Sequence, residues 1–230
     1  LDADGRAISS GGPGFLAAGY VDADKRRDLV VGWVNRQALY HVLYGGDGDQ
    51  AFAVPSAFTI PGFQGTPWNF ALADFDEDQR DDLLSLGIGN GQGNVRLRLN
   101  KGTRDNPFPA DVGPPIALPF ASRVAALDTN GDGRRDVLVA AATGTSAASL
   151  TVLLNQGGGQ LALANGASAS CAVDDDASGY LGYNLPLGDL MGDGRLSPIL
   201  KVVSSGSFPA FGAYPLDPRG RCSSSAPSVL

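Results

Sequence analysis

The sequence contains few of the residues from which catalytic and transition-metal centres are usually built. It has a single histidine, His41, and two cysteines, Cys171 and Cys222, which stand far apart. One histidine excludes most histidine-based metal sites and catalytic triads, and the two cysteines lack the close spacing of a metal site. His41 lies in a strand pattern without an identifiable nucleophile or acid, so we interpret it as a packed or surface residue of a strand.

Long hydrophobic runs and helical patterns are also lacking. No stretch reaches the ~18 apolar residues of a membrane span, so we expect no direct membrane insertion. No long segment combines helical periodicity with capping residues, which argues against a helical fold. The chain begins at Leu1 with neither an initiator methionine nor a signal peptide, and we therefore expect a mature product or an excerpt of a longer protein.

Turn-forming residues are abundant instead. The 230 residues include 32 glycines and 15 prolines, spread along the chain, and 43% of all residues are hydrophobic. This amount and distribution favour many short strands that are joined by tight turns and surround a packed interior. We therefore predict an all-β fold.

The acidic residues are nearly all aspartates, because Glu77 is the single glutamate among 24 acids. Fourteen of them fall in four short windows, at 22–28, 74–82, 128–136 and 189–193. Aspartate is both a turn residue and a ligand of hard cations, so the clustering indicates a role beyond solubility. The formal net charge of −7 disfavours nucleic acid or an anionic membrane as the main partner.

Each acidic window lies at the centre of a repeat that occurs four times. A copy has an apolar strand before the Asp loop, two strands after it, and a glycine-rich turn before a fourth strand. Four strands in about 50 residues are typical of one blade of a β-propeller. We predict a single propeller-like domain over 1–230, with repeats at 15–66, 67–120, 121–178 and 179–230, and with 1–14 as the outer hairpin of a partial blade.

The loops of the second and third repeats place oxygen-bearing side chains at positions 1, 3, 5 and 9. Such sets, completed by the backbone carbonyl of position 7 and by water, suit Ca²⁺ better than Mg²⁺, which prefers fewer protein ligands. Ordinary Asp/Gly hairpin turns without an ion are the alternative interpretation. The predicted ligands are Asp74, Asp76, Asp78, Arg80 and Asp82 in the second loop, and Asp128, Asn130, Asp132, Arg134 and Asp136 in the third.

The first and fourth loops match this pattern less well. The first offers Asp22, Asp24 and Asp28, and when Asp22 is aligned with Asp74 the loop is two residues shorter; an empty turn fits it as well as a calcium site. The fourth has Met191 and Ser197 at two ligand positions, which favours a turn without metal.

These repeats resemble the FG-GAP/VCBS family, the calcium-loop repeats of integrin α-subunit propellers and of many bacterial surface proteins. The Asp loop followed by an apolar strand carries the resemblance, which extends over nearly the whole chain. It implies a propeller whose loop between the first two strands of a blade holds Ca²⁺, with the second- and third-loop residues named above as ligands. The tract from Cys171 to Asp189 is also similar to repeats of large bacterial RHS-type toxin proteins.

Three functions are compatible with these patterns. The first is a non-catalytic calcium-binding module that mediates protein or glycan binding or adhesion in a secreted or cell-surface protein. The second is a structural segment of a large secreted toxin-type assembly. The third, a polysaccharide lyase-like enzyme, is least favoured because a lyase needs a base in a charged cleft, and three lysines and one histidine form no recognisable cluster.

Acidic calcium loops suit the millimolar calcium outside cells, so we expect an extracellular location. That compartment is oxidising, which favours a disulfide between Cys171 and Cys222. Two separate buried thiols are the alternative.

Overall fold

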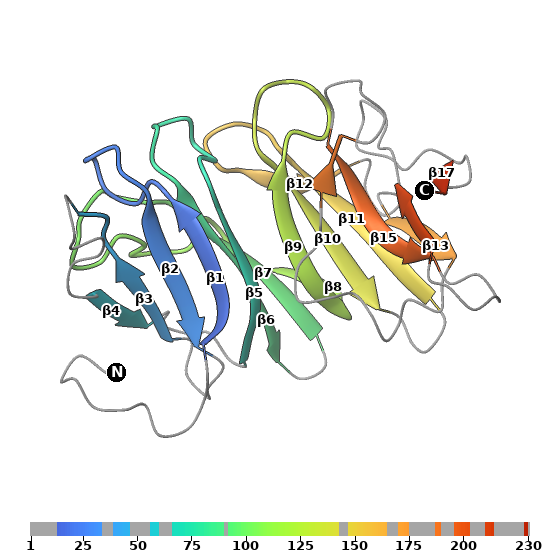
Figure 1. Ribbon diagram of the computed structural model, residues 1–230, viewed down its shortest axis with the longest axis horizontal. Helices are drawn as coiled ribbons and strands as arrows, with labels where there is room; N and C mark the ends of the chain where they lie inside the picture. Colours follow the sequence, from blue (N-terminus) through green and yellow to red (C-terminus); the bar gives the residue numbers. More distant parts are fainter. Residues whose placement is uncertain are drawn as a thin grey trace. The chain divides into compact units, whose positions relative to one another are not determined.

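The structure, a computed structural model, describes residues 13–33, 39–46, 56–59, 66–89, 92–142, 147–164, 170–174, 187–189, 196–202, 210–213 and 228–229. Within these ranges the chain has seventeen β-strands and no helix (Figure 1). The all-β prediction is confirmed.

The strands form four antiparallel sheets that follow one another along the chain. The first contains β1 (Pro13–Gly19), β2 (Asp28–Trp33), β3 (Leu39–Leu43) and β4 (Ser56–Thr59), and the second contains β5 (Thr66–Ala73), β6 (Asp82–Gly89), β7 (Gln92–Arg98) and β8 (Ile116–Pro119). The third contains β9 (Ala121–Leu127), β10 (Asp136–Ala142), β11 (Ala147–Asn155), β12 (Leu161–Leu163) and β13 (Ser170–Asp174). The fourth contains β14 (Leu187–Gly188), β15 (Ser197–Val202), β16 (Ala210–Ala213) and β17 (Ser228–Val229).

In three sheets each strand pairs with the next along the chain, as in a propeller blade. The third sheet differs from the predicted four strands at its outer edge. There β12 pairs with the end of β11 and β13 pairs with its beginning, so two short strands share the edge that one strand covers in the other sheets. The nine-residue length of β11 provides room for both. The division into repeats at the predicted boundaries stays a prediction.

In the second and third sheets the second strand, which lies between two neighbours, is the most buried element. Residues Asp82 to Gly87 of β6 and Asp136 to Ala141 of β10 are buried without interruption. A continuous apolar run, rather than an alternating pattern, is expected of a strand that is covered on both faces.

The chain divides into two compact units, Leu1–Ala117 and Leu118–Leu230. In the first unit β1 packs against β5, and a shared core joins the first two sheets. Tyr40 of β3 and Phe70 of β5 meet edge to face in this core, with ring centroids 5.4 Å apart. In the second unit the buried side chains come mainly from β9, β10 and β11, among them Leu127, Leu138 and Leu153.

Candidate metal centres in the Asp loops

The strand register gives all four Asp loops the same length. Gly19 pairs with Asp28, Ala73 with Asp82, Leu127 with Asp136 and Gly188 with Ser197, so each loop has eight residues between its paired ends. The prediction that the first loop is two residues shorter is therefore wrong. Aligning its first aspartate with Asp74 misplaced the loop by two positions, because the register is fixed by the paired strand ends and not by the aspartates.

In the corrected alignment the first loop lacks one carboxylate only. Tyr20 stands at position 1, where the second and third loops have Asp74 and Asp128. Asp22 and Asp24 then occupy positions 3 and 5, and Asp28 occupies position 9.

The aspartate at position 9 closes each of the first three loops. The carboxylate of Asp28 accepts hydrogen bonds from the backbone N–H groups of Val21 and Gly45, each at 2.8 Å. Asp82 accepts from Phe75 and Asn100, also at 2.8 Å. Asp136 accepts from Thr129 at 2.9 Å and from Asn155 at 2.8 Å. One oxygen thus holds the start of the loop, and the other holds a residue at or just beyond the end of the third strand.

These closing aspartates have no exposed surface, and burial raises the pKa of Asp28, Asp82 and Asp136. For Asp82 the pKa rises to about 7, because the charges of Asp76 and Asp78 add to the burial. The sequence pattern predicts these residues as metal ligands but does not show that they close the loop. The signal is their constant place, directly before the apolar run of the second strand.

A second feature common to the three loops is a tight turn at positions 5 to 7. The backbone N–H of position 7 donates to the aspartate at position 5, from Arg26 to Asp24, from Arg80 to Asp78 and from Arg134 to Asp132. Position 6 has a positive φ in all three, at 61° for Lys25, 69° for Gln79 and 88° for Gly133. The turn therefore forms whether or not glycine is present.

The second loop brings together the carboxylates of Asp74, Asp76 and Asp78, whose candidate ligand atoms lie within 4.8 Å of one another. Oδ1 of Asp76 is buried and has no hydrogen-bond partner. Burial, followed by repulsion from Asp78 and Asp74, raises the pKa of Asp76. These three residues form a carboxylate group with one unsatisfied oxygen and more negative charge than its surroundings neutralise.

The third loop has the same positions but a more open arrangement. Asp128 accepts hydrogen bonds from the N–H groups of Gly131 (2.6 Å) and Gly133 (2.9 Å). Nδ2 of Asn130 lies 3.1 Å from Oδ2 of Asp132, within hydrogen-bond distance. In this loop the predicted ligands satisfy one another and the backbone.

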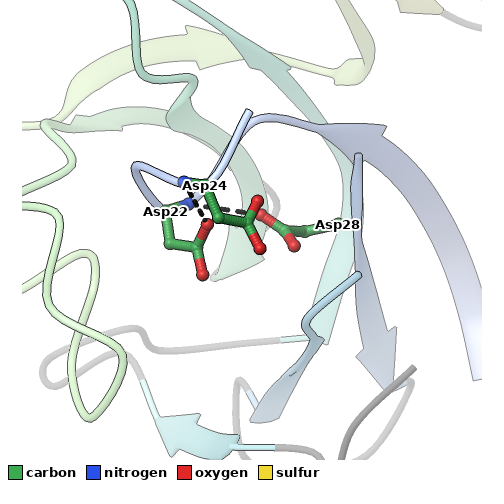
Figure 2. A group of neighbouring side chains, drawn as sticks. All are labelled: Asp22, Asp24 and Asp28. Atoms are coloured by element: carbon green, nitrogen blue, oxygen red, sulfur yellow. Dashed lines mark hydrogen bonds between the residues drawn. The ribbon is translucent and has the colours of Figure 1, made fainter. Parts of the chain in front are cut away.

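The first loop also gathers its carboxylates, and Figure 2 shows those of Asp22, Asp24 and Asp28 close to one another. Here an arginine from the second sheet's connection between β7 and β8 reaches the group. Nε of Arg104 donates to Oδ2 of Asp22 over 2.8 Å, and Nη2 lies 3.6 Å from Oδ2 of Asp24. A hydrogen bond from Arg26 is the main cause that lowers the pKa of Asp24, with the charges of Arg26 and Arg104 contributing less.

The sequence matches a known family at these loops. The FG-GAP-like repeat matches residues 21–85 and 74–139, and the FG-GAP repeat matches 120–162. Together the matches extend over more than half of the chain. The chain belongs to the FG-GAP repeat family. No curated protein matches it.

Membership in the FG-GAP family confirms the predicted resemblance and a β-propeller type of module. FG-GAP repeats bind Ca²⁺ in general, are typical of extracellular or surface proteins and are generally non-catalytic. In the part of the chain that the structure describes, no helix has the length and hydrophobicity needed to cross a membrane. His41, in β3, is a buried strand residue, as predicted.

Residues of two neighbouring FG-GAP loops meet in the first unit. The backbone N–H of Tyr20 donates to Oδ2 of Asp81, and the N–H of Asp81 donates to the carbonyl of Tyr20, both over 2.7 Å. Gly19 permits this approach, because a Cβ there would lie 2.5 Å from Oδ2 of Asp81. Buried Asn100 adds two hydrogen bonds from Nδ2, to the carbonyls of Val21 (2.6 Å) and Asp81 (3.0 Å).

A pocket of about 470 Å³ opens between these two loops. Its walls contain groups of both charge signs and one tyrosine ring; the lining residues are Tyr20, Asp22, Ala23, Lys25, Asp78, Gln79 and Arg80. Sequence reasoning missed this pocket, together with Asn100, Asp81 and Arg104. Only Asn100 has a sequence signal, since Asn155 makes the same contact to the closing aspartate from the end of the third strand of its own sheet.

Two further predictions lie outside the described residues. Of the fourth loop the structure describes Asp189, Leu196 and Ser197, so Met191 and the remainder of that loop are not included. Cys222 also lies outside, and the disulfide with Cys171 stays a prediction.

Proposed function

We propose that the chain is a non-catalytic, calcium-binding β-propeller module of a secreted or surface protein, and that it binds a protein or glycan ligand. The observation that carries the calcium part is Oδ1 of Asp76, a buried carboxylate oxygen without a hydrogen-bond partner. A buried, unpaired and charged oxygen costs free energy unless a cation or a donor reaches it.

The donor set suits calcium. Asp74, Asp76 and Asp78 supply oxygen ligands from one loop, and family membership adds Asp82 and the carbonyl of Arg80 by position. Ca²⁺ accepts six to eight oxygen ligands in flexible geometry, whereas Mg²⁺ requires a stricter octahedron with several waters. A divalent cation would also remove the repulsion that raises the pKa of Asp76.

The third loop supports a second site because it has the same length and turn. Asp128, Asn130 and Asp132 stand at positions 1, 3 and 5, as Asp74, Asp76 and Asp78 do. The hydrogen bonds that these residues now make would be exchanged for metal contacts. We expect this site to bind calcium more weakly than the second loop, because one carboxylate is replaced by a neutral amide.

The pocket between the first two loops favours a polar ligand. Tyr20 is 38% exposed, with the guanidinium of Arg27 over its ring at 5.3 Å from the centroid, and Lys25, Arg80 and Asp78 offer donors and acceptors. Aromatic faces beside paired charges recognise sugar rings or polar peptide segments. Calcium in the second loop would hold Asp78 and Arg80 at the wall of this pocket.

Thermal unfolding with and without calcium tests the metal part. We expect calcium to raise the melting temperature of the wild-type protein and to have a smaller effect on Asp76→Ala. Equal shifts in the two proteins would contradict the assignment of Asp76.

Screening of glycan and peptide arrays tests the ligand part. A hit should lose at least tenfold in affinity in Tyr20→Ala. Leu16→Ala, which changes a residue of β1 that is 65% exposed and lies outside the pocket, should keep the affinity. A ligand that binds Tyr20→Ala as well as wild type would place recognition elsewhere.

A further inference from the structure

The guanidinium of Arg104 lies where a cation would neutralise the first loop. Nε and Nη2 both contact Oδ2 of Asp22, whose side chain is only 6% exposed. The guanidinium also stacks over Tyr44, 4.8 Å from the ring centroid. The hydroxyl of Tyr44 donates to the carbonyl of Arg104 over 2.9 Å. The arginine is thus held at its backbone and at its head group.

Other donors complete the hydrogen bonding of this loop. Oδ1 of Asp22 accepts from the N–H of Asp24 over 2.9 Å, and Oδ1 of Asp24 accepts from the N–H of Arg26 over 2.8 Å. Both oxygens of Asp28 accept from backbone N–H groups. Each carboxylate oxygen of the three residues therefore has a positively charged or N–H partner. This contrasts with Asp76 in the second loop, whose Oδ1 has none.

The number of carboxylates in each of the two loops is matched to the charge of its cation. The second loop has aspartates at positions 1, 3, 5 and 9, whereas the first has Tyr20 at position 1 and aspartates at the other three. One negative charge is missing from the first loop. A monovalent guanidinium therefore leaves the three carboxylates of the first loop with the same net charge that a divalent ion would leave on the four carboxylates of the second loop.

We propose that Arg104 is the resident cation of the first loop, and that this loop takes no calcium while the second loop does. The proposal rests on the proposed function only for the second half of that statement. It makes the junction between the first two sheets independent of calcium, because the arginine comes from the second sheet's β7–β8 connection and the carboxylates come from the first sheet. Calcium removal would then affect the second and third loops and leave this junction closed.

Calorimetric titration in a background without the other sites tests the proposal. Asp78→Ala with Asp132→Ala removes calcium binding by the second and third loops, and we expect this background protein to bind no calcium up to millimolar concentration. Adding Tyr20→Asp and Arg104→Gln restores position 1 and removes the guanidinium, and we expect one calcium site to appear. With Tyr20→Asp alone, calcium should bind this site at least tenfold more weakly than with both changes. The matched control is Tyr20→Asp with Arg26→Gln, because Arg26 contacts Asp24 from within the loop, and it should behave like Tyr20→Asp alone.

Calcium binding by the background protein that is lost on Asp22→Asn would overturn the proposal, as would a first loop that stays empty after both changes. A second measurement needs no metal. In chelator, Asp22→Asn and Arg104→Gln should each lower the urea midpoint, and the double variant should fall no further than the larger single shift. Additive shifts would contradict the pairing. If wild-type protein binds no calcium but this coupling is found, the proposed function fails and the role of Arg104 stands.

Discussion

The backbone N–H of Asn100 donates to Oδ1 of Asp82 over 2.8 Å, and so joins the end of the third strand to the end of the Asp loop. The other oxygen of Asp82 holds the N–H of Phe75 at the start of the loop. The same two contacts recur at Asp28 and Asp136. The closing aspartate is therefore a structural element of the repeat.

Asp82→Ala should destabilise the calcium-free protein by about 2–3 kcal/mol, because it leaves two backbone N–H groups in a buried place without acceptors. Urea denaturation in chelator measures the effect without interference from metal binding. Asp105→Ala, at an exposed position of the same unit, is the control and should change the stability by less than about 0.5 kcal/mol. If the two variants are equally stable, Asp82 does not stabilise the fold by accepting hydrogen bonds from these N–H groups.

The stability of the calcium-free protein should depend on pH through Asp82. An aspartate of the unfolded chain titrates near pH ~3.9, whereas burial raises the pKa of Asp82 in the folded protein to about 7. Between these values the folded state binds more protons than the unfolded state, so this group makes the free energy of unfolding fall as the pH rises. The fall is at most about 4 kcal/mol from a shift of this size.

Asp82→Asn isolates this contribution. The wild-type protein should lose more stability than Asp82→Asn between pH 4 and pH 7, as measured by urea midpoints at several pH values in chelator. Parallel pH profiles of the two proteins would show that Asp82 has an ordinary pKa.

Asn100→Ala should cost about 2–4 kcal/mol, because the buried side chain donates to Val21 and Asp81 and accepts from the N–H of Gly102 over 2.8 Å. Asn106→Ala is the matched control, since residue 106 is exposed and its carbonyl, which the substitution keeps, is the group that Thr103 contacts. Chemical denaturation compares the two. A loss below about 0.5 kcal/mol for Asn100→Ala would contradict its role in joining the first two sheets.

Gln79→Gly should stabilise the protein by about 0.5 kcal/mol, because Gln79 adopts a φ of 69° that glycine adopts without strain, although glycine loses more entropy on folding. The reverse change, Gly133→Ala, should destabilise by about 1 kcal/mol at the same position of the third loop. Apart from its two chain neighbours, no residue has an atom within 4 Å of an added Cβ there, so the backbone conformation sets the cost. Thermal unfolding of both variants checks the pair, and opposite signs are required.

The fold class and the positions of the first three Asp loops could be predicted from local patterns. An apolar run that follows an acidic turn, repeated at regular intervals, shows a central strand and its loop without knowledge of tertiary contacts. The register of the first loop could not be predicted in this way. Tyr20 gives no sign that it stands at a ligand position, and the register is decided by the pairing of Gly19 with Asp28.

The contacts between the first two sheets could not be predicted from the sequence either. Asp22 and Arg104 are 82 residues apart, and Arg104 has no counterpart in a repeating pattern that would draw attention to it. The split outer edge of the third sheet depends on the length of β11, and the sequence pattern does not show how long this strand is. Long-range pairing of this kind becomes visible only when the strands are in place.

The most direct measurement of the central claim is calorimetric titration of the metal-stripped protein with calcium. We expect two sites within the described residues, with Asp78→Ala and Asp132→Ala each removing one and leaving the other. Glu77→Gln is the control, since it removes an equal charge from an exposed, non-liganding position of the second loop and should keep both sites. At free calcium 100-fold above its dissociation constant, one site should add about 2.7 kcal/mol of stability. Absence of calcium binding at millimolar concentration, or unchanged binding in both alanine variants, would contradict calcium binding by the second and third loops.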